Sequence, residues 1–161
     1  MTLALRLTGE RSEAEELVQD SFLRAFRSLE SFRGDAKFST WFYRILYNVC
    51  MTRLRRRRTL PLQDPRDDEP GGGAEYADAA PDILERLESD EMRQILMEEI
   101  DLLPEAFRAA LTLFYVQDLR YEEMTAVLQI PLGTVKTNLS RGRTLLRKRI
   151  LERMKDEVHA Q

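Results

Sequence analysis

Apolar residues recur at helical spacing along almost the whole chain, and this period constrains the fold more than any other feature of the sequence. Between residues 14 and 29 they return every three or four positions, and residues 38–49 and 134–154 show the same spacing. The alternation of apolar and polar residues that is typical of a half-buried strand is not found. The sequence therefore predicts an all-α fold.

One stretch breaks this helical pattern. Residues 60–82 contain the run PLQDPRDDEPGGG, which is rich in proline, glycine and acid and has no apolar period. We therefore expect two small helical domains, residues 1–59 and 92–161. They are joined by a flexible acidic linker, residues 60–91, in which helix begins again near residue 83. Such a linker carries few contacts, so we expect the two domains to fold separately.

The net charge of −3 conceals two basic blocks. Residues 1–58 carry 12 basic and 7 acidic side chains, and residues 131–155 carry 8 basic and 1 acidic. Residues 64–91, in contrast, carry 2 basic and 11 acidic side chains. A nucleic acid responds to local charge rather than to the total, so both basic blocks are candidate nucleic-acid surfaces.

The chain has a single cysteine, Cys50, and a single histidine, His159. We therefore expect no disulfide within the chain, no metal site and no cofactor. No apolar run approaches the roughly 20 residues of a membrane span, and the start MTLALRLTGE is too short and lightly charged for a signal peptide. We expect a cytoplasmic protein without membrane insertion. The sequence contains no recognisable nucleophile–base pair and no phosphate-binding loop. We therefore do not expect an enzyme.

The C-terminal half has the element order of a helix-turn-helix domain. A helix that starts at Pro104 is followed by a short helix over Tyr121–Leu128 and a turn over Ile130–Gly133. A longer basic helix then runs from Thr134 to about Met154. A helix, a tight turn and a second basic helix in this order are typical of proteins that insert the second helix into the major groove of DNA.

The last of these helices separates an apolar side from a basic side. Projected at about 100° per residue, Val135 and Leu139 fall on one side and Arg141 and Lys148 on the other. We also expect the helix start at Gly133–Thr134 to offer free amides to phosphate. Arg, Lys, Thr and Asn side chains are able to read base edges in the major groove. A solvated basic helix without a ligand is the alternative.

A second basic segment follows an aromatic helix in the N-terminal half. Five arginines fall within Arg53–Arg58, directly after FSTWFYRILYN. One or two cations would complement a helix dipole, so five predict phosphate contact. We expect Tyr43, Tyr47 and Asn48 to be exposed, whereas the other aromatic residues fit the buried side. Phe32 lies in a loop, where a ring has less reason to be buried. Aromatic rings stack on unpaired bases, so this segment suits DNA whose strands are separating.

The order of four motifs resembles the extracytoplasmic-function (ECF) sigma factors of bacterial RNA polymerase, a group within the sigma-70 superfamily. Any one of the motifs alone is weak evidence, but four in series around a variable linker are strong evidence. The four stretches are AEELVQDSFLRAFRSLESFRG, FSTWFYRILYNVCMTRLRRR, LPEAFRAALTLFYVQDLRYEEMTAVL and IPLGTVKTNLSRGRTLLRKR.

The resemblance implies a region 2 helical bundle in the first domain and a region 4 helix-turn-helix in the second. The bundle is N-terminally short, because relatives carry a further helical stretch before LALRLTG. Without that stretch we expect part of the face that carries Leu17, Phe22 and Phe26 to be exposed.

The same resemblance implies three groups of site residues. Residues that dock on the polymerase core are Glu16, Gln19 and Asp20. Residues that bind the downstream (−10) promoter element are Phe32, Tyr43, Tyr47, Asn48, Arg53, Arg55, Arg56 and Arg57. Residues that bind the upstream (−35) element are Thr134, Lys136, Thr137, Asn138, Ser140, Arg141 and Arg143. Among the second group, the loop at Phe32 and the helix around Asn48 would hold a flipped base.

The partners implied by this resemblance are the RNA polymerase core, promoter DNA and an anti-sigma factor. On the core, the contacts would be to the clamp helices of the largest subunit and to the flap. Two alternatives stay open. A helix-turn-helix regulator that acts without polymerase would leave Arg53–Arg58 without a use. An all-helical interaction protein with no DNA role would leave the basic final helix unexplained.

Overall fold

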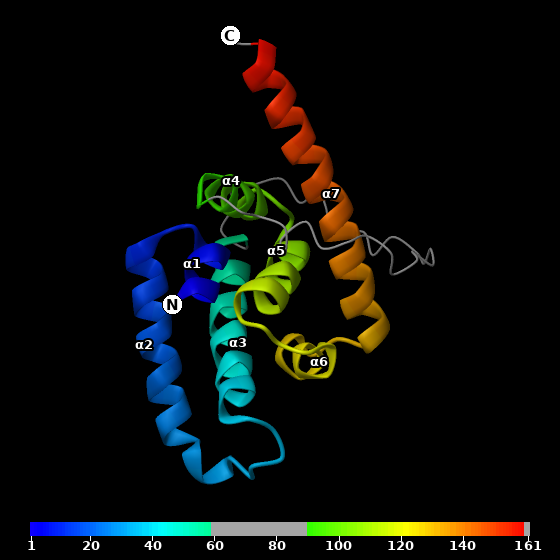
Figure 1. The fold of residues 1–161 in the computed structure, drawn as a ribbon. Helices are drawn as coiled ribbons and strands as arrows, with labels where there is room; N and C mark the ends of the chain where they lie inside the picture. Colours follow the sequence, from blue (N-terminus) through cyan, green and yellow to red (C-terminus); the bar gives the residue numbers. More distant parts are fainter. Residues whose placement is uncertain (59–89, 160–161) are drawn as a thin grey trace.

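The computed structural model describes residues 1–58 and 90–159 of the chain, and within these ranges it contains helices and no strand. The expected linker and the helix start near residue 83 lie outside the described residues. The all-α fold that the apolar period predicts is confirmed (Figure 1). The elements are α1 (Thr2–Thr8), α2 (Arg11–Arg27), the 3-10 turn η1 (Leu29–Ser31), α3 (Phe38–Arg58), α4 (Asp90–Asp101), α5 (Glu105–Leu111), the π-helical turn η2 (Thr112–Val116), α6 (Tyr121–Leu128) and α7 (Leu132–His159).

Local signals explain several of the helix ends. Gly9 takes a left-handed conformation (φ 75°) and donates its amide to the Leu5 carbonyl, which ends α1 as expected for a glycine C-cap. At the start of α6 the Glu123 carboxylate accepts a 2.8 Å hydrogen bond from the Arg120 amide. That backbone hydrogen bond is the main cause of the lowered pKa of Glu123. The carboxylate therefore stays ionised and holds the helix start in place.

The N-terminal helices form a small bundle. Helices α2 and α3 run antiparallel, and α1 packs on both of them (Figure 1). Helix α2 begins at Arg11 after an extended Glu10. Helix α3 starts at Phe38.

Helix α7 is packed against the other helices of the C-terminal half. Helix α7 packs on α5 and α6 and, further along, on α4, and its last turns extend away from the rest of the chain (Figure 1). Glu99 of α4 is buried and pairs with Arg149 at 2.8 Å and Arg153 at 3.3 Å. These ion pairs fix α7 beside α4.

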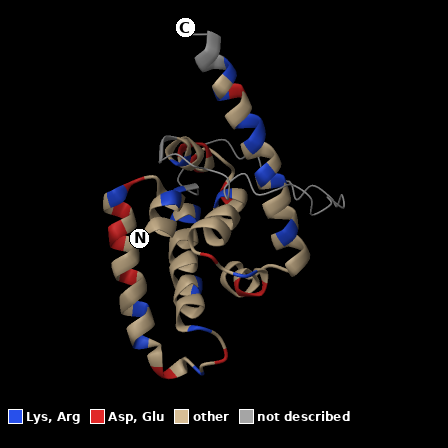
Figure 2. Cartoon of the chain, viewed as in Figure 1, with Lys and Arg blue, Asp and Glu red and all other residues tan. Residues whose placement is uncertain are grey.

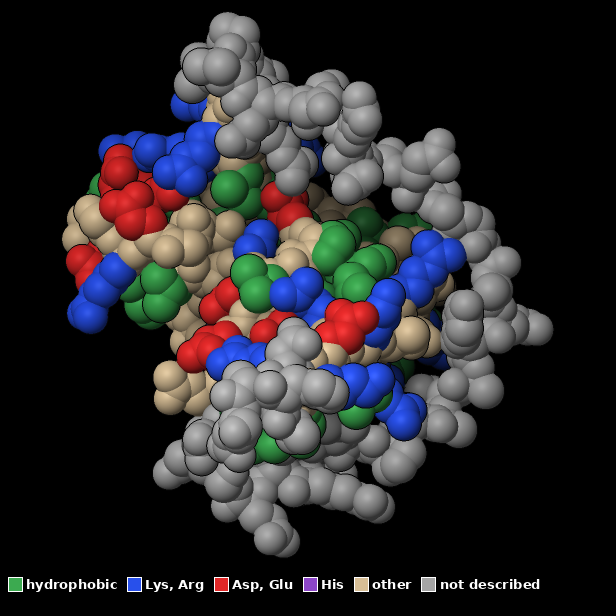
Figure 3. Space-filling view, turned by 90° about the horizontal axis from the view of Figure 1, so that it is seen from above, with side chains coloured by type: hydrophobic (Ala, Val, Ile, Leu, Met, Phe, Trp, Pro, Cys, Tyr) green, Lys and Arg blue, Asp and Glu red, His purple; other side chains and the backbone are tan. Residues whose placement is uncertain are grey.

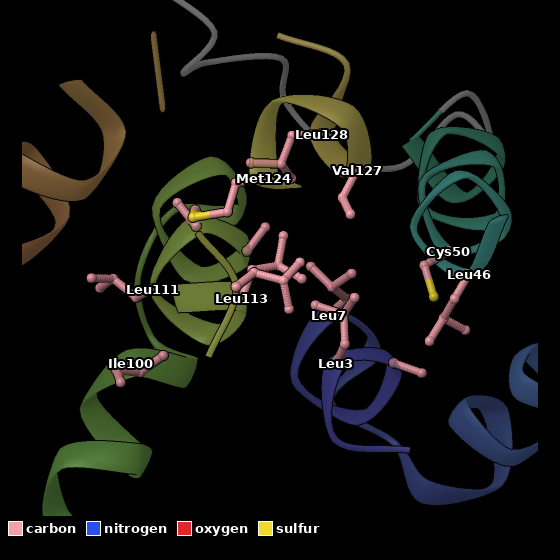
Figure 4. Close-up of a cluster of buried hydrophobic side chains, with 14 of the residues drawn as sticks. Leu3, Leu7, Leu46, Cys50, Ile100, Leu111, Leu113, Met124, Val127 and Leu128 are labelled. Carbon is pink, nitrogen blue, oxygen red and sulfur yellow. The ribbon is translucent and has the colours of Figure 1, made fainter. Parts of the chain in front are cut away.

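The two halves share one buried apolar cluster. Leu3 and Leu7 of α1 point into the same space as Leu46 of α3 and as Leu113 and Val127 from the C-terminal half (Figure 4). Helix α3 also packs directly on α6. This arrangement differs from the expectation of two separate cores, because α1 contributes apolar side chains to both halves.

An apolar face on α2 lies open to solvent. Phe22 is 57% exposed and Phe26 79% exposed, and together with Phe38 they line a hollow of about 600 Å³. The expected exposure of this face is therefore confirmed for Phe22 and Phe26. Leu17 belongs to the part of the face that is buried against the bundle.

Candidate nucleic-acid interfaces

The packing of α7 on α5 decides which side of α7 faces outward. Val135 and Leu139 are fully buried, and Gly142 lies so close to α5 that an added Cβ would approach Leu111 and Phe107 to 3.2 Å. The buried side is the one that the helical projection predicts. Basic residues recur along much of α7 (Figure 2).

The outward side of α7 forms a ridge with a shallow hollow. Five residues line a hollow of about 180 Å³, namely Ser140, Arg141, Thr144, Leu145 and Lys148. Nearer the helix start, Thr134 and Lys136 are exposed and Thr137 and Asn138 are half-buried. Of the seven proposed upstream-element residues, Ser140 and Arg141 therefore line this hollow, and Thr134, Lys136, Thr137 and Asn138 are at least partly exposed on the first turns of the same helix.

The start of α7 differs from the expected phosphate site. The helix begins at Leu132, two residues earlier than expected. The Thr134 and Val135 amides both donate to the Pro131 carbonyl at 3.0 Å. The Thr134 amide is therefore not free for phosphate, and the expectation of open amides at Gly133–Thr134 is wrong for that residue.

Arg143 is the one member of the set that turns inward. Its Nε donates a 2.6 Å hydrogen bond to the Tyr115 hydroxyl, and its guanidinium lies 5.4 Å from the centre of the Phe114 ring. Burial works to lower the pKa of Arg143, but the hydroxyls of Tyr115 and Tyr121 outweigh it and the pKa is raised. No pattern in the sequence indicates this role for Phe114 and Tyr115.

The candidate downstream-element residues on α3 fall into two environments. Asn48 is exposed, as expected. Tyr43 and Tyr47 are half-buried, and the Tyr43 hydroxyl is hydrogen-bonded to Gln117. Burial raises the pKa of both phenols. The expected exposure of the two tyrosines is wrong in this arrangement, because α6 and the turn before it cover that side of α3.

Phe32 belongs to a small aromatic cluster beside the start of α3. Its ring lies 5.6 Å from that of Phe38 and 5.3 Å from that of Trp41. Phe32 is half-buried, while Phe38 is 49% exposed. The cluster presents an aromatic surface next to the loop that joins α2 to α3.

Some arginines at the end of α3 form ion pairs with carboxylates of α2. Arg57 pairs at 2.9 Å with Glu13, whose side chain is buried, and Arg53 pairs at 3.0 Å with Glu16. Arg55, Arg56 and Arg57 all have exposed side chains, and Arg57 is 51% exposed despite its ion pair. Glu13 is a residue that the sequence argument missed, although its i, i+4 spacing to Leu17 places it on the inner face of α2.

The three candidate core-docking residues lie on or beside the outer face of α2. Glu16 and Gln19 are exposed, and Asp20 pairs with Arg24 one turn further along, at 3.0 Å. Acidic residues gather on the first half of α2 and basic residues on its second half (Figure 2). On the face seen from above, acidic and basic side chains lie next to one another instead of forming a patch of one sign (Figure 3).

Neither a metal site nor a membrane-spanning helix is found in the residues that the structure describes. Over residues 1–58 and 90–159 no group of three His, Cys, Asp or Glu side chains is arranged to hold a metal ion. No helix in that part of the chain is long and apolar enough to cross a membrane. Cys50 is buried, and burial raises the pKa of its thiol to about 12.

Two family models match the chain. The model described as Sigma-70 region 2 matches residues 1–59, and the model described as Sigma-70, region 4 matches residues 93–146.

Relatives and a solved structure agree with these matches. The ECF RNA polymerase sigma factor SigW of Bacillus subtilis is 34% identical over 151 residues, covering 92% of this chain and 81% of that protein. The ECF RNA polymerase sigma-E factor of Escherichia coli is 36% identical over 143 residues, covering 86% of this chain and 74% of that protein. In fold, the chain is similar to the sigma factor RpoE of Bartonella quintana, solved with the anti-sigma factor NepR. The TM-score is 0.66 at 24% identity, over 91% of this chain and 86% of that one.

Proposed function

The chain belongs to the ECF family of RNA polymerase sigma factors, and from this premise we propose how its residues divide the work of promoter recognition. A sigma factor binds core polymerase, recognises two promoter elements and promotes strand opening. We assign the downstream element to residues 1–59 and the upstream element to residues 92–161, with residues 60–91 as the connection between them.

The upstream element is assigned to the outward ridge of α7. This ridge is the observation that carries the proposal, since its polar and basic side chains lie opposite a fully buried apolar side. An α-helix fits the major groove, where Arg and Lys read guanine and Thr and Asn read bases or touch phosphate. Arg141 lies at the centre of the ridge, and Lys136 and Thr137 lie one turn closer to the helix start.

The downstream element is assigned to α3 and the loop before it. Asn48 is exposed on α3, and Arg55 and Arg56 extend from its last turns. A base that leaves the stack would be held near Asn48 and the Phe32 cluster, while the arginines neutralise phosphates. Tyr43 and Tyr47 join this surface only after α6 moves away from α3.

Protein partners are assigned to the outer faces. We place the clamp helices of the largest polymerase subunit at Glu16, Gln19 and Asp20, and the flap at the C-terminal half. The fold neighbour from Bartonella quintana is bound to an anti-sigma factor, and we propose that this chain also has one. Catalysis belongs to the polymerase, so the chain itself is no enzyme. The bacterial cytoplasm is the proposed place of action.

Abortive transcription with purified core polymerase tests this assignment. The template is a promoter library in which the upstream and downstream elements are randomised. We expect short RNAs that need both the chain and the core enzyme, from templates that share one upstream and one downstream sequence. A chain that binds duplex DNA alone and yields no core-dependent RNA would instead be a regulator of the helix-turn-helix class.

A further inference from the structure

Arg141 and Arg143 lie two residues apart on α7, but their side chains contact different parts of the molecule. Arg141 lines the outward hollow together with Thr144 and Lys148. Arg143 points toward the body of the domain, where Tyr115 accepts its hydrogen bond at 2.6 Å. Both arginines are half-buried, so the direction of the Arg143 guanidinium, and not its exposed fraction, separates it from the surface that DNA would approach.

The partners of Arg143 come from the segment that leads into the helix-turn-helix. Its guanidinium lies 5.4 Å from the ring centre of Phe114 and 5.5 Å from that of Tyr115, both within the π-helical turn η2. Phe114 in turn packs on Tyr121, the first residue of α6, with 5.4 Å between ring centres. One guanidinium therefore joins α7 to η2 and, through Phe114, to the start of α6.

The chemistry of this contact is directional. A guanidinium is planar, so it donates along its edge while its face lies over a ring, whereas a lysine ammonium is a point charge. The contact fixes the rotation of α7 about its own axis as well as its distance from η2. A rotation of α7 would move the base-reading ridge around the groove, because that ridge occupies only one side of the helix.

We propose that Arg143 is a positioning residue that sets the angle of α7 against η2 and α6, and that it does not read the upstream element itself. This inference rests on the proposed function of α7 as the DNA-reading helix. On this proposal Arg143 is not one of the residues that contact bases. Tyr115 of η2 then affects which upstream element is bound, because it helps to set the angle of α7.

The salt dependence of duplex binding separates positioning from phosphate contact. The probe is the duplex that the full wild-type chain enriches from a randomised pool of 20-base-pair DNAs. For Arg143→Gln we expect about tenfold weaker binding at one salt concentration but an unchanged slope of log Kd against log salt. The matched control Arg141→Gln should lower that slope by about 0.9, the value for one lost phosphate contact. A slope that falls equally in both variants overturns the proposal.

Tyr115→Phe gives a second readout, which keeps the test decisive where Arg143→Gln disturbs folding. The variant retains the aromatic ring and removes only the hydroxyl that accepts the hydrogen bond from Nε of Arg143. We expect a loss of affinity of a few fold, again with an unchanged slope, and a double variant no weaker than Arg143→Gln alone. Affinity equal to that of the wild type would contradict the proposal.

A DNA-independent measurement separates this inference from the proposed function. In the ¹⁵N spectrum of the free chain we expect a slowly exchanging Nε–H signal from Arg143 that disappears in Tyr115→Phe. If the wild type enriches no duplex while this signal is present, the role of α7 is wrong and the contact stands. If the signal is absent from a folded wild-type chain, the positioning contact is wrong.

Discussion

At the scale of single residues, Gly142 shows how closely α7 approaches α5. An added Cβ would lie 3.2 Å from Leu111 and Phe107, tighter than ordinary van der Waals contact. A helical glycine costs about 1 kcal/mol relative to alanine, so its presence here reflects packing. We expect Gly142→Val to lower the free energy of unfolding by about 1–3 kcal/mol through overpacking.

The control for Gly142 lies in the same helix. Gly133 has nothing within 4 Å of its ideal Cβ position, so Gly133→Val introduces the same side chain without the clash. Denaturant unfolding of the two variants measures the difference. Equal losses of stability would show that helix propensity, and not the contact with α5, determines the effect.

Cys50 gives a residue-scale prediction about pH. Burial raises the pKa of its thiol to about 12 in the folded chain, while the unfolded thiol ionises near its ordinary value of about 9. Between these two values the unfolded chain has lost a proton that the folded chain keeps. Stability therefore falls as pH rises from about 9 to about 12, by up to about 1.4 kcal/mol per pH unit. Below about pH 9 the thiol contributes no pH dependence.

Cys50→Ala isolates this contribution from other groups that titrate at high pH. We expect the variant to be less stable than the wild type at pH 8, because a buried side chain is truncated, but to lose less stability toward pH 11. Urea unfolding at a series of pH values measures both. Parallel stability curves would mean that the thiol is accessible to water in the folded chain.

At the scale of elements, the ends of α3 and α2 are joined through charge. Arg57 lies 2.9 Å from the buried Glu13, although its own side chain is 51% exposed, and Arg55 and Arg56 are exposed as well. We expect Arg55→Ala and Arg56→Ala each to lower the salt slope of promoter binding by about 0.7–0.9. Arg57→Ala should instead destabilise the fold by about 1 kcal/mol, since it leaves a buried carboxylate with a weaker partner. Matching salt slopes for all three variants would contradict this division.

Element ends were predictable where the signal was local. Helix α6 has the expected bounds because Gln129 takes a left-handed conformation directly after Leu128 and ends it. The burial of Tyr43 was not predictable, since its partner Gln117 lies 74 positions away in the sequence. The pairing of Arg53 with Glu16 likewise crosses between helices. The spacing of apolar residues in the sequence indicates which side of a helix is apolar, but it does not indicate which other helix covers the polar side.

At the scale of the whole molecule, the two halves are held together by both apolar and polar contacts. Lys37 and Thr40 at the start of α3 contact Glu123 of α6, at 3.1 Å and 3.4 Å. Arg6 of α1 donates to the Met97 carbonyl and to Asp101 of α4. These polar contacts contribute to the stability of the chain together with the packing of α6 on α3 and the hydrogen bond between Tyr43 and Gln117. If Tyr43 and Tyr47 are to reach DNA, as proposed above, we expect the contacts between α3 and α6 to break.

The shared core makes a prediction about the C-terminal half alone. A fragment of residues 90–161 keeps the packing of α7 on α4, α5 and α6, including the buried Leu111 and Leu139. It loses the cover that α1 and α3 provide for Leu113 and Val127. We therefore expect a helical fragment with a Tm clearly below that of the whole chain, because newly exposed apolar surface costs about 25 cal/mol per Å².

Circular dichroism of the fragment, with and without a second fragment of residues 1–59, measures the contribution of the shared core. Adding residues 1–59 should raise the Tm, and Val127→Asp in the C-terminal fragment should remove that increase, since it places a charge in the shared apolar cluster. Leu132→Asp is the matched control, because Leu132 is exposed in the structure. A fragment as stable as the whole chain would mean that the halves do not stabilise each other, so that opening onto DNA would need no energy from polymerase binding.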